Sequence, residues 1–171
     1  MVASNHSADT DELKPLIPTS HHPLLVGDIL NSRYEILEKL GCSNLTTIWR
    51  AKDSLNWRIV MLKVFKAEVG TDIIESQVVT KLAEGALRHK GRKCVSLPWD
   101  VFTINGANGT HKCLVYEIAG CTLEQSKEVV RWPKFSVNVA RAIVAQVLLG
   151  MEYIHSCGVV HGGEYGSEYV V

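Results

Sequence analysis

The first candidate for a functional residue is a lysine that lies within an apolar segment. Lys63 lies in residues 58–65, Arg-Ile-Val-Met-Leu-Lys-Val-Phe, which are otherwise almost wholly apolar and rich in β-branched side chains. Such a segment is typical of a buried strand, and an unpaired ammonium group is costly to bury. Lys63 must therefore have a partner or line a cleft, where it would act as a cation held in a fixed position.

The neighbouring segments predict the sheet that positions this lysine. Residues 34–40 and 47–53 have the composition of two preceding strands, and the small and polar residues 41–46 form the turn between them. Successive side chains of a strand point to opposite faces. Met61 and Lys63 are therefore expected on the same face of their strand.

Two later segments have the apolar spacing of helices, and two more have the composition of strands. Residues 71–84 and 137–155 carry apolar side chains at i, i+3 and i+4 spacing. Residues 91–103 and 112–116 predict a fourth strand, with its turn, and a fifth strand, with two Asn-Gly turn signals between them.

This order of elements resembles the nucleotide-binding lobe of a protein kinase. The family's glycine-rich loop, G-x-G-x-x-G-x-V, aligns with Gly41, Ser43, Thr46 and Ile48, so only the first glycine is retained, and its V-A-I-K strand aligns with residues 60–63. The resemblance implies an α+β fold. A five-stranded antiparallel sheet and helix C would form the N-terminal lobe, followed by the hinge and the first helices of an incomplete C-terminal lobe.

The same resemblance implies a site for ATP and Mg²⁺. Glu75 matches the family's glutamate that orients the lysine. Without the resemblance, the helix pattern would predict that Glu75 is a solvent-exposed residue. Tyr116 matches the gatekeeper, and residues 117–119 match the hinge, whose backbone groups bind the edges of adenine. The implied ATP-binding set is Leu40, Gly41, Ser43, Thr46, Ile48, Met61, Lys63, Glu75, Tyr116, Glu117 and Ala119.

A hairpin sequence narrows the resemblance to SR-protein kinases and their fungal relatives. Residues 108–111, Asn-Gly-Thr-His, lead into Cys-Leu-Val-Tyr-Glu at 113–117, which is similar to the group's "NGTH…LVFE" run, and residues 89–95 echo its "HPGRKYV". The implied activity is phosphoryl transfer from ATP to Ser or Thr of Ser/Arg-rich proteins.

The catalytic loop departs from the family pattern. Residues 153–161 resemble the approach to this loop, but Gly163, Tyr165 and Glu168 stand at the positions of the catalytic aspartate, the phosphate-contacting lysine and the metal-binding asparagine. Glycine can neither accept a proton nor bind Mg²⁺, so no intact catalytic residue is expected. Glu168 is an oxygen donor that could still hold a metal ion. The alternatives to a kinase are a catalytically dead pseudokinase or interaction module, with weak or no ATP binding, and a degenerate fragment.

The chain divides into three parts by composition and resemblance. Residues 1–25 are expected to be a disordered leader, 26–118 the N-terminal lobe, and 119–171 the hinge with a partial C-terminal lobe that holds helices D and E. No Asp-Phe-Gly segment follows the catalytic-loop positions, and little of the chain remains to cover the apolar stripe of residues 137–155. We therefore expect marginal stability, a partner or aggregation.

Charge and cysteine content limit the remaining functions. Equal numbers of acidic and basic residues, 18 of each, give no net attraction to nucleic acid or membrane, and no apolar run is long enough to span a bilayer. Five cysteines without a signal peptide suggest reduced thiols in the cytoplasm or nucleus. The pair His21–His22 is interpreted as solvated tail rather than a metal site, and no metal site is assigned.

Overall fold

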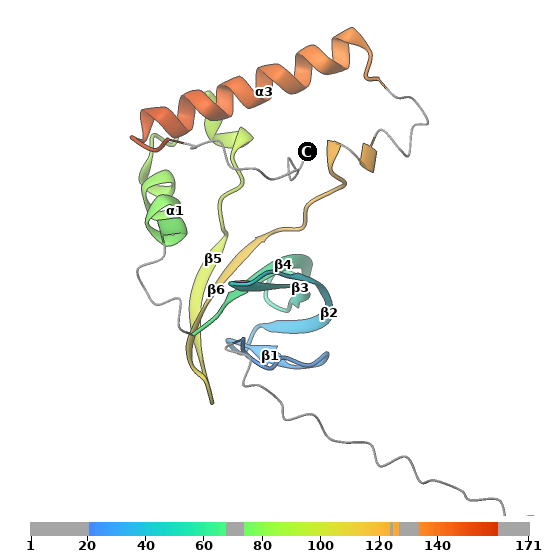
Figure 1. Ribbon diagram of the computed structural model, residues 1–171, viewed down its shortest axis with the longest axis vertical. Helices are drawn as coiled ribbons and strands as arrows, with labels where there is room; N and C mark the ends of the chain where they lie inside the picture. Colours follow the sequence, from blue (N-terminus) through green and yellow to red (C-terminus); the bar gives the residue numbers. More distant parts are fainter. Residues whose placement is uncertain (1–20, 68–73, 124, 127–133, 161–171) are drawn as a thin grey trace, which may run out of the picture.

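The computed structural model describes residues 21–67, 74–123, 125–126 and 134–160, apart from the side chains of 74–76. A sheet fills one end of the molecule and α3 lies across the other, with α1 beside α3 (Figure 1). The elements in chain order are β1 (Ile29–Leu30), β2 (Tyr34–Cys42), β3 (Thr46–Asp53), β4 (Arg58–Phe65), α1 (Ile74–Glu84), the 3₁₀ helix η1 (Lys90–Cys94), β5 (Asp100–Gly106), β6 (Gly109–Glu117) and α3 (Val137–Ser156).

The sheet is antiparallel and contains six strands in the order β1-β2-β3-β4-β6-β5. The α+β class and the lobe architecture are confirmed, but the sequence predicted one strand too few. The additional strand, β1, pairs Ile29 with Glu35 and Leu30 with Tyr34. A strand of two residues is too short to show an alternating pattern, which is why the sequence did not reveal it.

The predicted fourth strand begins later than expected. Residues 90–94 form η1 instead, and the strand starts only at Asp100. The imidazole of His89 accepts a hydrogen bond from the backbone N–H of Gly91 at 3.1 Å, which caps η1. Pro98 lacks an N–H group and cannot donate to a strand ladder, so pairing begins after it.

The main core lies on one face of the curved sheet. Val60, Leu62 and Val64 of β4 are each at most 1% exposed and belong to this core. Full burial of one such side chain contributes roughly 1.5–3 kcal/mol. This face of β4 is therefore buried, and the strand covers the predicted range.

Contacts between β2 and β5 close the curved sheet. The Tyr34 ring stacks on Phe102 with centroids 5.4 Å apart, and the Tyr34 hydroxyl donates to Asp100 at 2.7 Å. Next to it, Arg33 donates to both carboxylate oxygens of Asp53, at 2.7 and 2.9 Å. The hydrogen bonds from Arg33 have the largest effect on the pKa of Asp53, and together with those from Asn56 and Leu55 they hold it well below its usual range.

The ordered fold begins earlier than predicted. The sequence analysis expected a disordered leader over residues 1–25. Leu24 is 7% exposed and lies in the main core. His22 packs against the ring of His111 with centroids 4.8 Å apart, so the prediction of a solvated histidine pair is wrong. Residues 1–20 lie outside the described part of the chain.

One tyrosine joins the helical elements to each other. Tyr153 of α3 is fully buried, and its hydroxyl donates to the backbone oxygen of Leu82 in α1 while accepting a hydrogen bond from Arg92 of η1 at 2.6 Å. Arg92 also donates to Leu82 O at 2.9 Å. Gly91 packs so closely on α3 that an added Cβ would overlap the carbonyl oxygen of Leu149.

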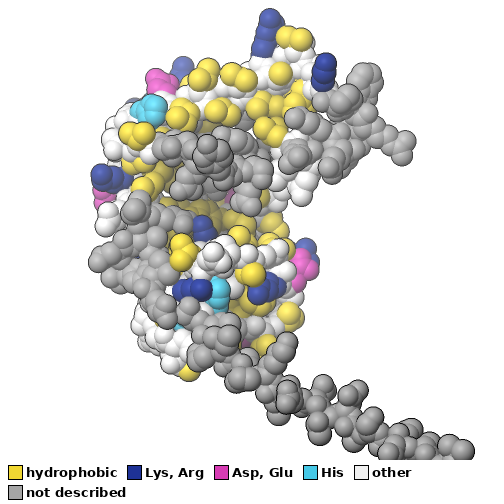
Figure 2. Space-filling view, viewed as in Figure 1, with side chains coloured by type: hydrophobic (Ala, Val, Ile, Leu, Met, Phe, Trp, Pro, Cys, Tyr) yellow, Lys and Arg dark blue, Asp and Glu magenta, His cyan; other side chains and the backbone are white. Residues whose placement is uncertain are grey.

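The helix predicted over residues 137–155 is confirmed as α3, and its outer face is exposed. Hydrophobic side chains gather along α3 in the space-filling view (Figure 2), and Val137, Val144 and Leu148 are 64%, 55% and 62% exposed. By length and composition alone, α3 could cross a membrane, so the prediction that no run is long enough was wrong. The helix contains charged residues, and for that reason the sequence analysis did not count it as an apolar run.

Candidate nucleotide-binding site

The second face of β4 carries the predicted lysine. Met61 and Phe65 pack with Leu114 and Tyr116 of β6 into a separate apolar cluster, on the opposite face from Val60, Leu62 and Val64. Lys63 lies between Met61 and Phe65 on β4 and pairs with Ile48 on one side and Leu114 on the other. The predicted alternation along this strand is therefore confirmed.

The ammonium group of Lys63 lies against this apolar face. The side chain is half-buried, and Nζ lies 5.3 Å from the centroid of the Phe65 ring, which is within the range of a cation–π contact. Glu75 lies in α1 as predicted, but its side chain is outside the described residues. The pairing of Lys63 with Glu75 therefore stays a prediction.

The loop between β2 and β3 is closed by its own serine. The Oγ atom of Ser43 accepts hydrogen bonds from the backbone N–H groups of Leu45 at 3.3 Å and Thr46 at 3.1 Å. The backbone N–H of Ser43 donates to the Thr46 carbonyl at 2.8 Å, and the two hydroxyl groups lie 3.0 Å apart. The Thr46 side chain is buried by these contacts.

This arrangement changes what the loop can bind. A glycine-rich loop binds phosphate through backbone N–H groups that are free to point at the anion. Here the side chain of Ser43 already satisfies two of those groups. Gly41 keeps its open space, since nothing lies within 4 Å of an added Cβ, and Leu40 beside it is 47% exposed.

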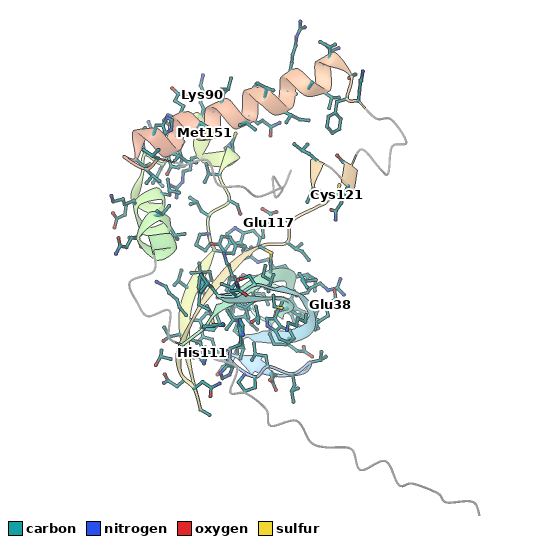
Figure 3. The ribbon with its side chains drawn as sticks, viewed as in Figure 1. Glu38, Lys90, His111, Glu117, Cys121 and Met151 are labelled. Carbon is teal, nitrogen blue, oxygen red and sulfur yellow. The ribbon has the colours of Figure 1, made fainter. Side chains whose placement is uncertain are left out.

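The residues matched to the hinge follow β6. Tyr116 is 8% exposed and pairs with Met61 across the sheet, while Glu117 ends the strand and Ala119 is exposed. Glu117 lies at the end of the sheet that faces the helical part of the molecule (Figure 3). The loop therefore adjoins the Phe65 end of β4 and the hinge adjoins its Val60 end, so the site residues extend along this strand.

A capped turn follows the hinge. The backbone N–H of Gln125 donates to the hydroxyl of Thr122 at 3.1 Å, and the N–H of Thr122 donates to the side-chain oxygen of Gln125 at 2.9 Å. This reciprocal pair is a capping box. Leu123, Gln125 and Ser126 are helical, which agrees with the short helix predicted at this point.

The catalytic-loop positions Gly163, Tyr165 and Glu168 lie outside the described residues. Within the described ranges, no group of three or more His, Cys, Asp and Glu side chains could hold a metal ion. A pocket lined mainly by basic residues of 87–93 lies beside η1. None of these residues belongs to the predicted ATP-binding set, so this pocket does not coincide with the predicted nucleotide site.

Sequence reasoning missed two features of this region. The serine cap was detectable, because a Ser or Thr whose hydroxyl accepts N–H groups two and three residues later is a common turn in such loops. The link from Arg92 to Tyr153 had no sequence signal, because the two residues lie 61 positions apart.

Comparison with known proteins gives a consistent set of relatives, although no protein-family profile matches the chain. The protein kinase dsk1 of Schizosaccharomyces pombe is 32% identical over 146 residues, covering 82% of this chain and 27% of that protein. SRSF protein kinase 3 of Homo sapiens is 29% identical over 157 residues, covering 90% and 28%. The serine/threonine-protein kinase spk-1 of Caenorhabditis elegans is 33% identical over 147 residues, covering 82% and 14%. The chain thus spans about a quarter or less of the length of these relatives.

Proposed function

The chain belongs to the protein kinase superfamily, in its SR-protein kinase-like group, and on this basis we propose that it binds ATP weakly and transfers no phosphate. In this proposal, the predicted lobe of residues 26–118, together with the preceding Leu24 of its core, binds the nucleotide, and residues 119–171 are the hinge with part of the second lobe. The five free cysteines support a cytoplasmic or nuclear location, where thiols stay reduced.

The position of Lys63 carries the proposal of ATP binding. Its half-buried ammonium lies on the same face as Met61 and Tyr116, so one face offers an apolar surface for adenine and a cation for a phosphate group. The backbone groups of Glu117 and Ala119 would bind the adenine edge. ATP, when bound, supplies the anion that this lysine would hold.

The loop geometry explains why the affinity is weak. Ser43 Oγ takes the N–H groups of Leu45 and Thr46, and these are donors that a phosphate would otherwise use. Each hydrogen bond that must be exchanged contributes about 0.5–1.5 kcal/mol. ATP therefore binds with fewer loop contacts than a glycine-rich loop would provide.

The residue types at the catalytic-loop positions support the absence of transfer. Gly163 has no side chain to accept the substrate proton, and Tyr165 has no positive charge for the phosphate. Glu168 is the remaining acid at these positions and could contribute one oxygen ligand to Mg²⁺. One acid without the aspartate does not reproduce the arrangement that phosphoryl transfer needs.

Calorimetric titration with Mg-ATP tests the binding proposal. We expect saturable binding to the chain and loss of that binding in Lys63→Ala. Lys52→Ala is the matched control, because Lys52 is also a half-buried strand lysine but packs against Trp57, with Nζ 5.4 Å from the ring centroid. Equal binding heats in the chain and in Lys63→Ala would overturn the assignment of the site.

A second candidate function is protein kinase activity on Ser/Arg-rich proteins, which the names of the relatives favour. A phosphate-transfer assay with labelled ATP and an Arg-Ser repeat peptide separates the two candidates. We expect no incorporation above a reaction without protein. Incorporation that disappears in Lys63→Ala would establish the kinase instead.

A further inference from the structure

Two histidines outside the nucleotide site have nitrogen atoms without partners. His111 of β6 is fully buried, and its Nδ1 lies 2.9 Å from the carbonyl oxygen of Phe65. A carbonyl oxygen can only accept, so Nδ1 carries the proton and Nε2 presents a lone pair. That Nε2 atom is buried and has no hydrogen-bond partner, and neither has Nδ1 of His22.

The two unpartnered nitrogens converge on one point. The rings of His22 and His111 are 4.8 Å apart between centroids, at an interplanar angle of 61°. A Cβ added at Gly106 would overlap Nδ1 of His22 and would lie 3.5 Å from Nε2 of His111. Both nitrogen atoms therefore lie beside Gly106, next to the turn of the β5–β6 hairpin, and Figure 3 labels His111 in this region.

We propose that His22 and His111 together bind a divalent transition metal ion of the Zn²⁺, Co²⁺ and Ni²⁺ class. Imidazole nitrogen is a preferred ligand of these ions. A hydrogen bond from the other ring nitrogen to a backbone carbonyl, as His111 donates to Phe65, is the usual outer support of a metal-bound histidine. The predicted ATP site does not use either residue.

The ring geometry fits a shared ion. With metal–nitrogen distances of about 2.1 Å, two imidazoles on one tetrahedral ion have centroids roughly 5 Å apart, close to the observed 4.8 Å. No third His, Cys, Asp or Glu in the described ranges completes a set of three ligands, so the proposed ion has two protein ligands in this part of the chain.

A different site, made by the adjacent histidines of the chain, is disfavoured by the structure. The Nε2 atom of His21 lies 3.2 Å from the carbonyl oxygen of Ser43 and is the donor of that hydrogen bond. His21 is therefore turned toward the loop between β2 and β3, while His22 is turned toward His111. This difference makes His21 a matched control for its neighbour.

Titration of the chelator-treated full chain with CoCl₂ and ZnCl₂ tests the site. We expect one ion per chain, visible absorption of bound Co²⁺ shifted from that of the hydrated ion, and a higher Tm with Zn²⁺. His22→Gln should weaken the affinity at least about tenfold, whereas His21→Gln and His89→Gln should leave it unchanged.

The variants also separate the possible failures. His111→Gln should abolish binding, and circular dichroism shows whether this buried substitution leaves the protein folded. If His111→Gln does not fold, the result for His22→Gln decides, because His22 lies at the edge of the fold and its replacement should leave the protein folded. The proposal is overturned if the chain binds neither ion, if His22→Gln binds as tightly as the unaltered chain, or if His21→Gln loses as much affinity as His22→Gln.

Discussion

The Oγ atom of Ser43 accepts the backbone N–H of Thr46 at 3.1 Å, within the loop that would cover a nucleotide phosphate. The same oxygen also accepts the N–H of Leu45. A glycine at position 43 could not make either bond. A single side chain thus converts a loop that is matched to a phosphate-binding loop into one whose donors are already used.

Replacement of this serine should strengthen nucleotide binding. Ser43→Gly frees the N–H groups of Leu45 and Thr46, and each is worth about 0.5–1.5 kcal/mol as a new hydrogen bond. Together the two bonds amount to about 1–3 kcal/mol, so we expect the affinity for Mg-ATP in calorimetry to rise about fivefold to a hundredfold. Ser96→Gly, at an exposed position outside the loop, is the control and should have no effect. An unchanged affinity in Ser43→Gly would show that the loop does not contact the phosphates.

Loss of the Tyr153 hydroxyl should destabilise the helical elements. Tyr153→Phe removes the bonds to Leu82 O and from Arg92, and two hydrogen bonds together contribute about 1–3 kcal/mol. Urea denaturation should show a free energy of unfolding lower by that amount. Leu148→Ala on the same helix is the control, because Leu148 is exposed, and its effect should stay within about 0.5 kcal/mol.

Acid should destabilise the fold through Asp53. The pKa of this carboxylate is lowered chiefly by hydrogen bonds from Arg33, so its contribution is complete above the unfolded-state pKa of about 3.9 and is lost as pH falls below it. The free energy of unfolding should therefore decrease from about pH 4 downward. Urea denaturation between pH 3 and pH 7 measures this decrease.

The substitution Asp53→Asn separates this carboxylate from other acidic groups. It should cost about 3 kcal/mol at pH 7, because it breaks a buried ion pair, and it should flatten the dependence below pH 4. Asp28→Asn is the control and should keep the slope of the unaltered chain. A slope that persists in Asp53→Asn would assign the acid sensitivity to another carboxylate.

Replacement by alanine should destabilise the fold at one glycine and have little effect at another. Gly91→Ala places a methyl group on the Leu149 carbonyl, and such overpacking costs about 1–3 kcal/mol. Gly41→Ala meets open space and should leave the Tm nearly unchanged. Differential scanning fluorimetry compares the two variants, and an equal loss of Tm in both would contradict the close contact between η1 and α3.

The exposed apolar face of α3 should drive association. Val137, Val144 and Leu148 are more than half exposed, and an apolar stripe of this kind favours contact with another apolar surface. Size-exclusion chromatography with light scattering should show oligomers or aggregates that diminish in a Val144→Glu, Leu148→Glu double variant. A well-dispersed monomer of the unaltered chain would contradict this prediction.

The sequence by itself determined the elements that have a strong local pattern. The short, apolar and β-branched run around Lys63 favours a strand, and β4 spans the predicted residues 58–65. The stripe of α3 is equally explicit, because its apolar side chains repeat at the period of a helix. Alternation along β4 also placed Met61 and Lys63 on one face without knowledge of their neighbours.

Only the tertiary structure decided the contacts between residues that are distant in the chain. Arg92 reaches Tyr153 and thereby fixes η1 where a strand was expected, and His22 reaches His111 where a solvated tail was expected. Neither pair has a sequence signal, because a hydrogen bond or ring contact depends on where two segments meet. Local periodicity records which face of an element is buried, and it contains no information about the partner that buries it.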